Sequence, residues 1–68
     1  MEVALIGKTL LFSGVSSNAV FRVVDLKGYV VKTGLALPMV DLSAVKTGVY
    51  AVVVRDGARK LVKKVPLW

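Results

Sequence analysis

The stretch Asp41–Val54, which reads D-L-S-A-V-K-T-G-V-Y-A-V-V-V, decides the fold of this 68-residue chain. Asp41 and Ser43 carry short polar side chains that hydrogen-bond neighbouring backbone, and the residues after them have room for one helical turn ending at Gly48. Val49–Val54 is a run of β-branched and aromatic residues with the length and composition of a buried strand. We therefore expect a central strand here, against which the other segments pair.

The composition indicates one small domain, residues 1–68, built from strands. Valine dominates the apolar residues, with fifteen copies against one isoleucine, and β-branched side chains suit a pleated sheet. The chain has neither cysteine nor histidine, so disulfides and the usual zinc ligands cannot supplement the core. Stability must therefore come from apolar packing in a chain that buries only about 60% of its unfolded surface.

The first third of the chain contains three predicted strands. Met1–Ile6 and Lys8–Ser13 are apolar segments separated by Gly7, and we expect the first to be an edge strand. The small, polar segment Gly14–Asn18 is typical of a loop. Ala19–Val24 alternates in polarity, which predicts a strand whose Ala19, Phe21 and Val23 side chains face the core.

A turn at Asp25–Gly28 predicts a hairpin that returns through Tyr29–Thr33. Gly34 is expected to break that strand. Leu35–Val40 then forms another short extended piece, in which Pro38 favours an edge or a bulge because it lacks a backbone donor.

The last hairpin turns at Arg55-Asp56-Gly57 and continues in a strand from Arg59 to about Val65, ended by Pro66. Lys63 shares a face with Leu61 and Val65, and this mixed pattern indicates either an edge strand with an inward lysine or a strand that carries a bulge. Six to seven short strands with frequent turns predict an all-β, antiparallel, immunoglobulin-like sandwich, with a small barrel as the second choice. The residues expected to shape its turns are Asp25, Gly28, Asp41, Gly48, Asp56 and Gly57.

The sequence offers no constellation for catalysis, a cofactor or a metal ion. The chain has four acidic residues, and Asp25, Asp41 and Asp56 all lie where a turn requires them. We therefore expect no enzyme activity and no cofactor.

The basic residues concentrate at the end of a chain whose net charge is +6. The final 14 residues contain five cations against Asp56 alone, a net charge of +4. Such a run is either a solvated face or a contact for an anionic partner. The candidate contact residues are Arg55, Arg59, Lys60, Lys63 and Lys64. Nucleic acid is a less favoured partner, because a strand-binding sheet displays aromatic rings among its basic positions.

Carbohydrate binding is the rival function, since small sandwiches hold sugars on exposed aromatic rings. Tyr29, beside a turn, and Trp68 are the candidate stacking residues. No segment is long and apolar enough to span a membrane: the longest uncharged run, Thr9–Phe21, has 13 residues and includes polar ones. The oligomeric state is left open by the sequence.

The sequence resembles the C-terminal sorting domains of proteins exported by the bacterial type IX secretion system. The likeness runs from about Lys8 to Val65, and flagellar hook-cap modules of immunoglobulin type share part of its pattern. Similar basic modules end secreted plant-wall-degrading enzymes. The segments that carry the resemblance are Leu10–Gly14, Phe21–Gly28, Val30–Val31, Val40–Ser43, Lys46–Tyr50 and Lys60–Lys64.

The resemblance implies a non-catalytic sorting or surface-anchoring module at the C-terminus of a larger secreted protein. Its expected partner is an outer-membrane export machine, and its expected location is outside the cell or on the outer cell surface. An anionic surface glycan or lipopolysaccharide is a further candidate partner for the basic end.

Overall fold

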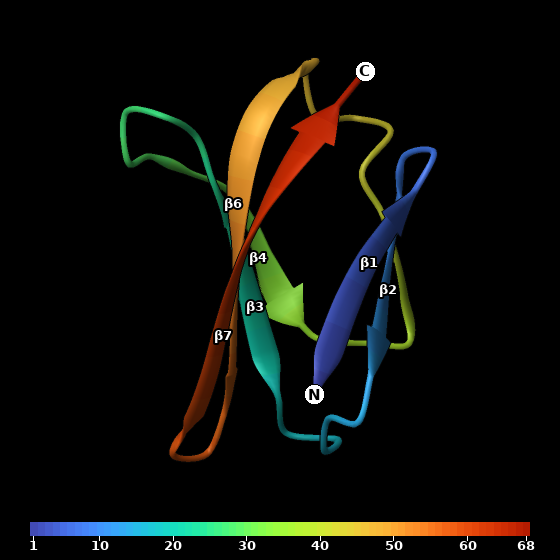
Figure 1. Ribbon diagram of the computed structural model, residues 1–68, viewed down its shortest axis with the longest axis vertical. Coiled ribbons are helices and arrows are strands. Elements are labelled where there is room, and N and C mark those ends of the chain that lie inside the picture. Colours follow the sequence, from blue (N-terminus) through green and yellow to red (C-terminus); the bar gives the residue numbers. More distant parts are fainter.

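The computed structural model describes residues 1–68 and contains seven β-strands in two sheets that pack face to face (Figure 1). The predicted antiparallel β-sandwich is therefore confirmed. No helix is present, and so none that could cross a membrane. The strands are β1 (Glu2–Ile6), β2 (Thr9–Ser13), β3 (Val20–Val24), β4 (Val30–Leu35), β5 (Met39–Asp41), β6 (Gly48–Asp56) and β7 (Arg59–Leu67).

The chain crosses between the two sheets three times. β1 and β2 form a hairpin, and β5 later returns to pair with β2, which gives a three-stranded sheet in the order β1-β2-β5. The other sheet has the order β4-β3-β6-β7, and every pair in both sheets is antiparallel. The long strands β6 and β7 are paired over nine positions, from Gly48 with Leu67 to Asp56 with Arg59.

The core consists of the inward residues of both sheets, and it contains no buried polar side chain. On β6, Tyr50, Val52 and Val54 are buried, while the residues between them are half-buried on the opposite face. The rings of Phe12 and Phe21 lie 5.5 Å apart between centroids and join the two sheets. Alternation along each strand thus separates one apolar interior from two solvent-facing surfaces.

The turns are built from short polar side chains that bind backbone. Asp25 Oδ1 accepts hydrogen bonds from the amides of Lys27 and Tyr29, each at 2.9 Å. Gly28 has a φ of 90°, in the left-handed region that glycine tolerates at no steric cost. This chemistry closes the β3–β4 hairpin.

The stretch before β6 contains no helical turn, contrary to our expectation. Asp41 accepts hydrogen bonds from the amide and hydroxyl of Ser43, and one further bond joins the amide of Val45 to the carbonyl of Leu42. Leu42 is 1% exposed. The segment therefore forms a single tight turn anchored by the buried side chain of Leu42. A helix would require further backbone hydrogen bonds after this one.

Two predicted strand ends were wrong. β4 continues through Gly34, which pairs with Phe21 of β3, and β7 continues through Pro66, which is opposite Val49. β4 and β7 are the two edges of their sheet, where only one side of a strand must supply ladder hydrogen bonds. Proline is tolerated there because its missing donor faces no partner strand. Gly34 keeps its backbone donor and lacks only a side chain, and the ring of Phe21 lies 3.6 Å from where its Cβ would be.

The extended piece predicted at Leu35–Val40 is also shorter than expected. Only Met39–Asp41 pairs as β5, whereas Ala36 and Leu37 form the crossover between the sheets. Pro38 directly precedes β5, which is an edge strand, and its carbonyl accepts a hydrogen bond from the amide of Phe12 at 3.1 Å.

Candidate recognition face

The acidic side chains are engaged in turns. The carboxylate of Asp56 accepts hydrogen bonds from the hydroxyl of Ser16 at 2.6 Å and from its amide at 2.8 Å, and these bonds lower the pKa of Asp56. The amide and hydroxyl of Ser43 lower the pKa of Asp41 in the same way. Together with Asp25, these carboxylates act as acceptors for neighbouring loops. No group of three or more acidic, histidine or cysteine side chains is placed to hold a metal ion.

The outer surface of the four-stranded sheet collects cations from three strands. Val20 and Arg22 of β3 point away from the core, since Phe21 and Val23 are buried. The register places Val20 opposite Arg55 and Arg22 opposite Val53 on β6. We call this surface the cationic face. Its charged residues are Arg22, Arg55, Lys60 and Lys64, and its apolar residues are Val20, Val24, Leu35, Ala51, Val53 and Val62.

The cationic face consists of cross-strand rows. Arg55 is opposite Lys60 in one row, Val53 is opposite Val62 in the next, and Ala51 is opposite Lys64 in the third. A hollow of about 360 Å³ lies on this face. It is lined by Val20, Phe21, Arg22, Thr33, Val53, Arg55 and Lys60.

The five basic residues singled out in the sequence divide between the two faces of the four-stranded sheet. Arg55, Lys60 and Lys64 lie on the cationic face, whereas Arg59 and Lys63 have the inward parity of Val65. Lys63 Nζ donates a 2.9 Å hydrogen bond to the carbonyl of Val3 in β1, which bridges the two sheets at their edge. Its inward direction agrees with the mixed polarity pattern of this strand.

Arg22 is the basic residue that the sequence alone did not bring into this group. Its alternation with Phe21 already placed it on the outward side of its strand. Its proximity to the basic end depends on the order β3-β6-β7, which local sequence does not specify.

The charge of the cationic face is of one sign. Of the four acidic residues, Glu2 is on β1, Asp41 is on β5, Asp25 is in a turn and Asp56 is bonded to Ser16. None of them lies among the four cations. The face therefore carries an uncompensated positive potential, which attracts negatively charged partners.

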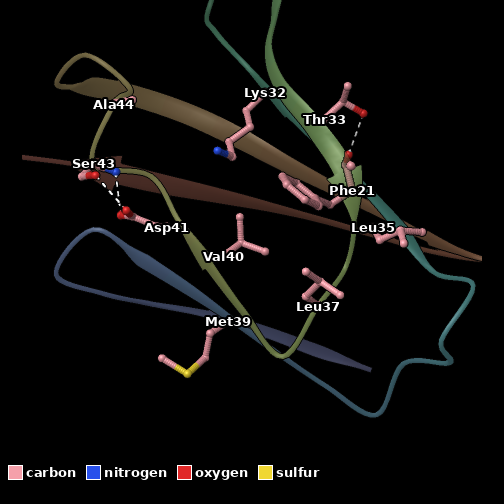
Figure 2. A pocket seen from close by; sticks show the side chains of 11 residues that line it. Phe21, Lys32, Thr33, Leu35, Leu37, Met39, Val40, Asp41, Ser43 and Ala44 are labelled. Carbon is pink, nitrogen blue, oxygen red and sulfur yellow. Dashed lines mark hydrogen bonds between the residues drawn. The ribbon is translucent and has the colours of Figure 1, made fainter.

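A second hollow, of about 410 Å³, opens between β4 and β5 at the edge of the sandwich (Figure 2). Leu35, Leu37 and Met39 line it and are 54%, 56% and 67% exposed. Figure 2 shows Lys32 of β4 on one wall and Asp41 of β5 on the other. Six of its eleven lining residues are apolar, and the carboxylate of Asp41 is engaged by the amide and hydroxyl of Ser43.

The two candidate sugar-stacking residues are both exposed, Tyr29 at 68% and Trp68 at 75%. Tyr29 precedes β4 and Trp68 follows β7, and these strands are opposite edges of the same sheet. Three strand spacings separate the edges, about 14 Å. The two rings therefore do not form one continuous platform.

Comparison with known protein families gives one match. The model of a family described as "Secretion system C-terminal sorting domain" matches residues 7–67, which include all strands from β2 to β7. Neither the search of curated proteins nor the search of solved structures found a match. Because the match covers nearly the whole chain, the chain belongs to the family of C-terminal sorting domains of the type IX secretion system, which mark proteins for export to the medium or the outer cell surface.

Proposed function

We propose that this chain is the non-catalytic C-terminal module of a larger secreted protein and directs that cargo through the outer-membrane export machine. The observation that carries the proposal is the family match over residues 7–67, which takes in nearly the entire sandwich. The recognised element is then a folded surface rather than a short linear signal.

The placement of the titratable side chains supports a non-catalytic role. General acid–base or nucleophilic chemistry requires several polar groups that converge on one pocket. Here the aspartates at positions 25, 41 and 56 bind turn amides or serine hydroxyls in three separate turns. The only tyrosine hydroxyl in the core, that of Tyr50, donates to the carbonyl of Lys46 at 2.6 Å.

A reporter fusion tests the proposal. The module is fused to the C-terminus of a periplasmically stable fluorescent protein and expressed in a bacterium with a working type IX system, and extracellular and cell-surface fluorescence is measured. Export should require both the module and the secretion machine, so a strain without the machine is the matched control. A reporter that stays inside the cell while the module is folded and protease-resistant would refute the proposed function.

Carbohydrate binding is the second candidate, supported by the exposure of Tyr29 and Trp68. Affinity electrophoresis in gels containing xylan, cellulose or lipopolysaccharide separates it from sorting. A sugar-binding module is retarded, and Tyr29→Ala or Trp68→Ala reduces the retardation by removing a stacking ring. Equal mobility with and without each polysaccharide would eliminate this candidate.

A further inference from the structure

The cationic face has the layout of a protein-binding surface. Val53 and Val62 form a cross-strand pair near its centre, and Val62 is 57% exposed. Neighbouring positions on one sheet face are about 5 Å apart across strands and about 7 Å apart along them. The four cations therefore surround this valine pair: Arg22 is beside Val53, and the Arg55–Lys60 and Lys64 rows lie on either side. An apolar centre inside a charged rim is the usual anatomy of a specific protein interface.

The same face is poorly suited to other anionic partners. Its exposed apolar side chains are short and fixed on a pleated sheet, so they cannot enter a bilayer as an amphipathic helix does. Four basic residues alone attract an anionic membrane only weakly and reversibly. Its strand residues include no exposed aromatic ring on which bases could stack, since Phe12, Phe21 and Tyr50 are in the core, and Tyr29 and Trp68 lie beyond the ends of β4 and β7.

The size of the face favours a transient contact. Four strands span about 19 Å, which limits the buried area to the lower end of the range for protein complexes. Electrostatic complementarity then contributes mainly to the rate and selectivity of encounter. These properties suit a signal that is recognised and later released.

We propose that the cationic face docks on an acidic protein surface with an apolar centre, carried by a component of the export machine. This inference rests on the proposed sorting function and adds to it the face, the residues and the chemistry of the partner. The residues that make the contact are Arg22, Arg55, Lys60, Lys64, Val53 and Val62.

The first experiment measures export of the reporter fusion with matched charge removal. One variant replaces the four cations of the face with glutamine, and the control removes the same charge from exposed positions elsewhere. We expect about a tenfold or larger fall in extracellular reporter for the face variant and little change for the control. The face variant carries R22Q, R55Q, K60Q and K64Q, and the control carries K8Q, K27Q, K46Q and R59Q.

Two measurements make the result interpretable. Thermal melting of each purified module by circular dichroism establishes that the variants fold, as expected for exposed side chains outside the core. Val62→Asp is the second test of the face, because it adds one negative charge at the exposed centre without altering a buried residue. It should reduce export at least as much as loss of a single cation.

The second experiment identifies the class of partner in exporting cells. A photo-crosslinking amino acid is placed at position 62, and Ala4 on the outer surface of the other sheet is the control position. We expect an adduct with an export-machine protein at position 62 that is lost in the four-cation variant and absent at position 4. Flotation with phosphatidylcholine vesicles containing about one quarter phosphatidylglycerol tests the membrane alternative.

The outcomes separate the inference from the function on which it rests. If the wild-type module exports the reporter but the face variant and Val62→Asp do so equally well, the docking inference is wrong and the sorting function stands. A crosslink to lipopolysaccharide, or vesicle binding that depends on the four cations, also overturns it. If the wild-type module exports nothing, both proposals fail.

Discussion

Val52 and Val53 are neighbours on β6 that face opposite sides of the same sheet. Val52 is fully buried between the sheets, whereas Val53 is half-buried on the cationic face. Replacing either residue with alanine removes the same two methyl groups from the same strand. The pair therefore measures how unequally the two faces contribute to stability.

The expected costs follow from burial. Two buried methyl groups lose about 1.6 kcal/mol of transfer free energy, and the cavity raises the cost of Val52→Ala to about 2–3 kcal/mol. Val53→Ala should cost under about 1 kcal/mol, because its surroundings are already partly hydrated. A domain of this size has a total stability of roughly 3–10 kcal/mol, so the first change removes a large share of it.

Urea denaturation followed by far-ultraviolet circular dichroism measures both costs. With a slope near 1 kcal/mol per molar urea, Val52→Ala should lower the midpoint by about 2–3 M and Val53→Ala by less than about 1 M. Trp68 is a poor fluorescence probe because it is 75% exposed. Equal midpoint shifts for the two variants would refute the assignment of inner and outer faces on β6.

Three further predictions concern the edges and turns. Lys63→Met should lower the free energy of unfolding by about 1 kcal/mol and speed hydrogen exchange in β1, since it removes the hydrogen bond to the carbonyl of Val3. Lys64→Met is the control and should change neither quantity; equal effects would contradict a link between the sheets through Lys63. The lowered pKa of Asp56 stabilises the fold above its ordinary value of 3.8, and this contribution is lost as pH falls through the lowered pKa. Melting temperatures of wild type and Ser16→Ala should therefore differ at pH 7 and draw together as the pH falls below 3.8, and a constant difference would contradict this linkage. Gly57→Ala should lower the free energy of unfolding by about 1 kcal/mol, because Gly57 has a φ of 62°, a left-handed conformation that costs alanine energy, while no atom would clash with the new Cβ. Calorimetry showing no loss would exclude strain at this turn.

Local sequence was sufficient wherever a residue's environment depends on its own strand. The alternation of Ala19, Phe21 and Val23 correctly predicted the buried face of the third strand. The mixed pattern around Lys63 left an edge strand and a bulge as alternatives; β7 is an edge strand in regular register, and Lys63 bonds β1. In each case the signal has the period of two that a pleated strand imposes.

Local sequence failed where the outcome depends on which strands are neighbours. Gly34 and Pro66 looked like strand ends because both residues weaken a strand that pairs on two sides. Pro66 lies in an edge strand that pairs on one side only, and Gly34 keeps its backbone donor and packs beside the Phe21 ring, so both ladders continue. The grouping of Arg22 with the basic end was missed for the same reason, since 33 residues separate Arg22 from Arg55 in the sequence.

The arrangement of the four-stranded sheet separates core packing from the cationic face at the level of single residues. Along β3 and β6, alternate side chains fill the core or lie on the cationic face. On β7 the outward side chains lie on that face, while the inward ones include the core residues Val65 and Leu67 and the edge residues Arg59 and Lys63. Mutations on the outer face therefore change charge and shape with little loss of stability, whereas truncations one position away, in the core, cost about 2–3 kcal/mol. A sorting domain built in this way can keep one valine-rich core while its outer face adapts to a partner. Of the ten basic residues, four lie on the cationic face, whereas Lys63 holds the edge strand β1 and so contributes to the fold.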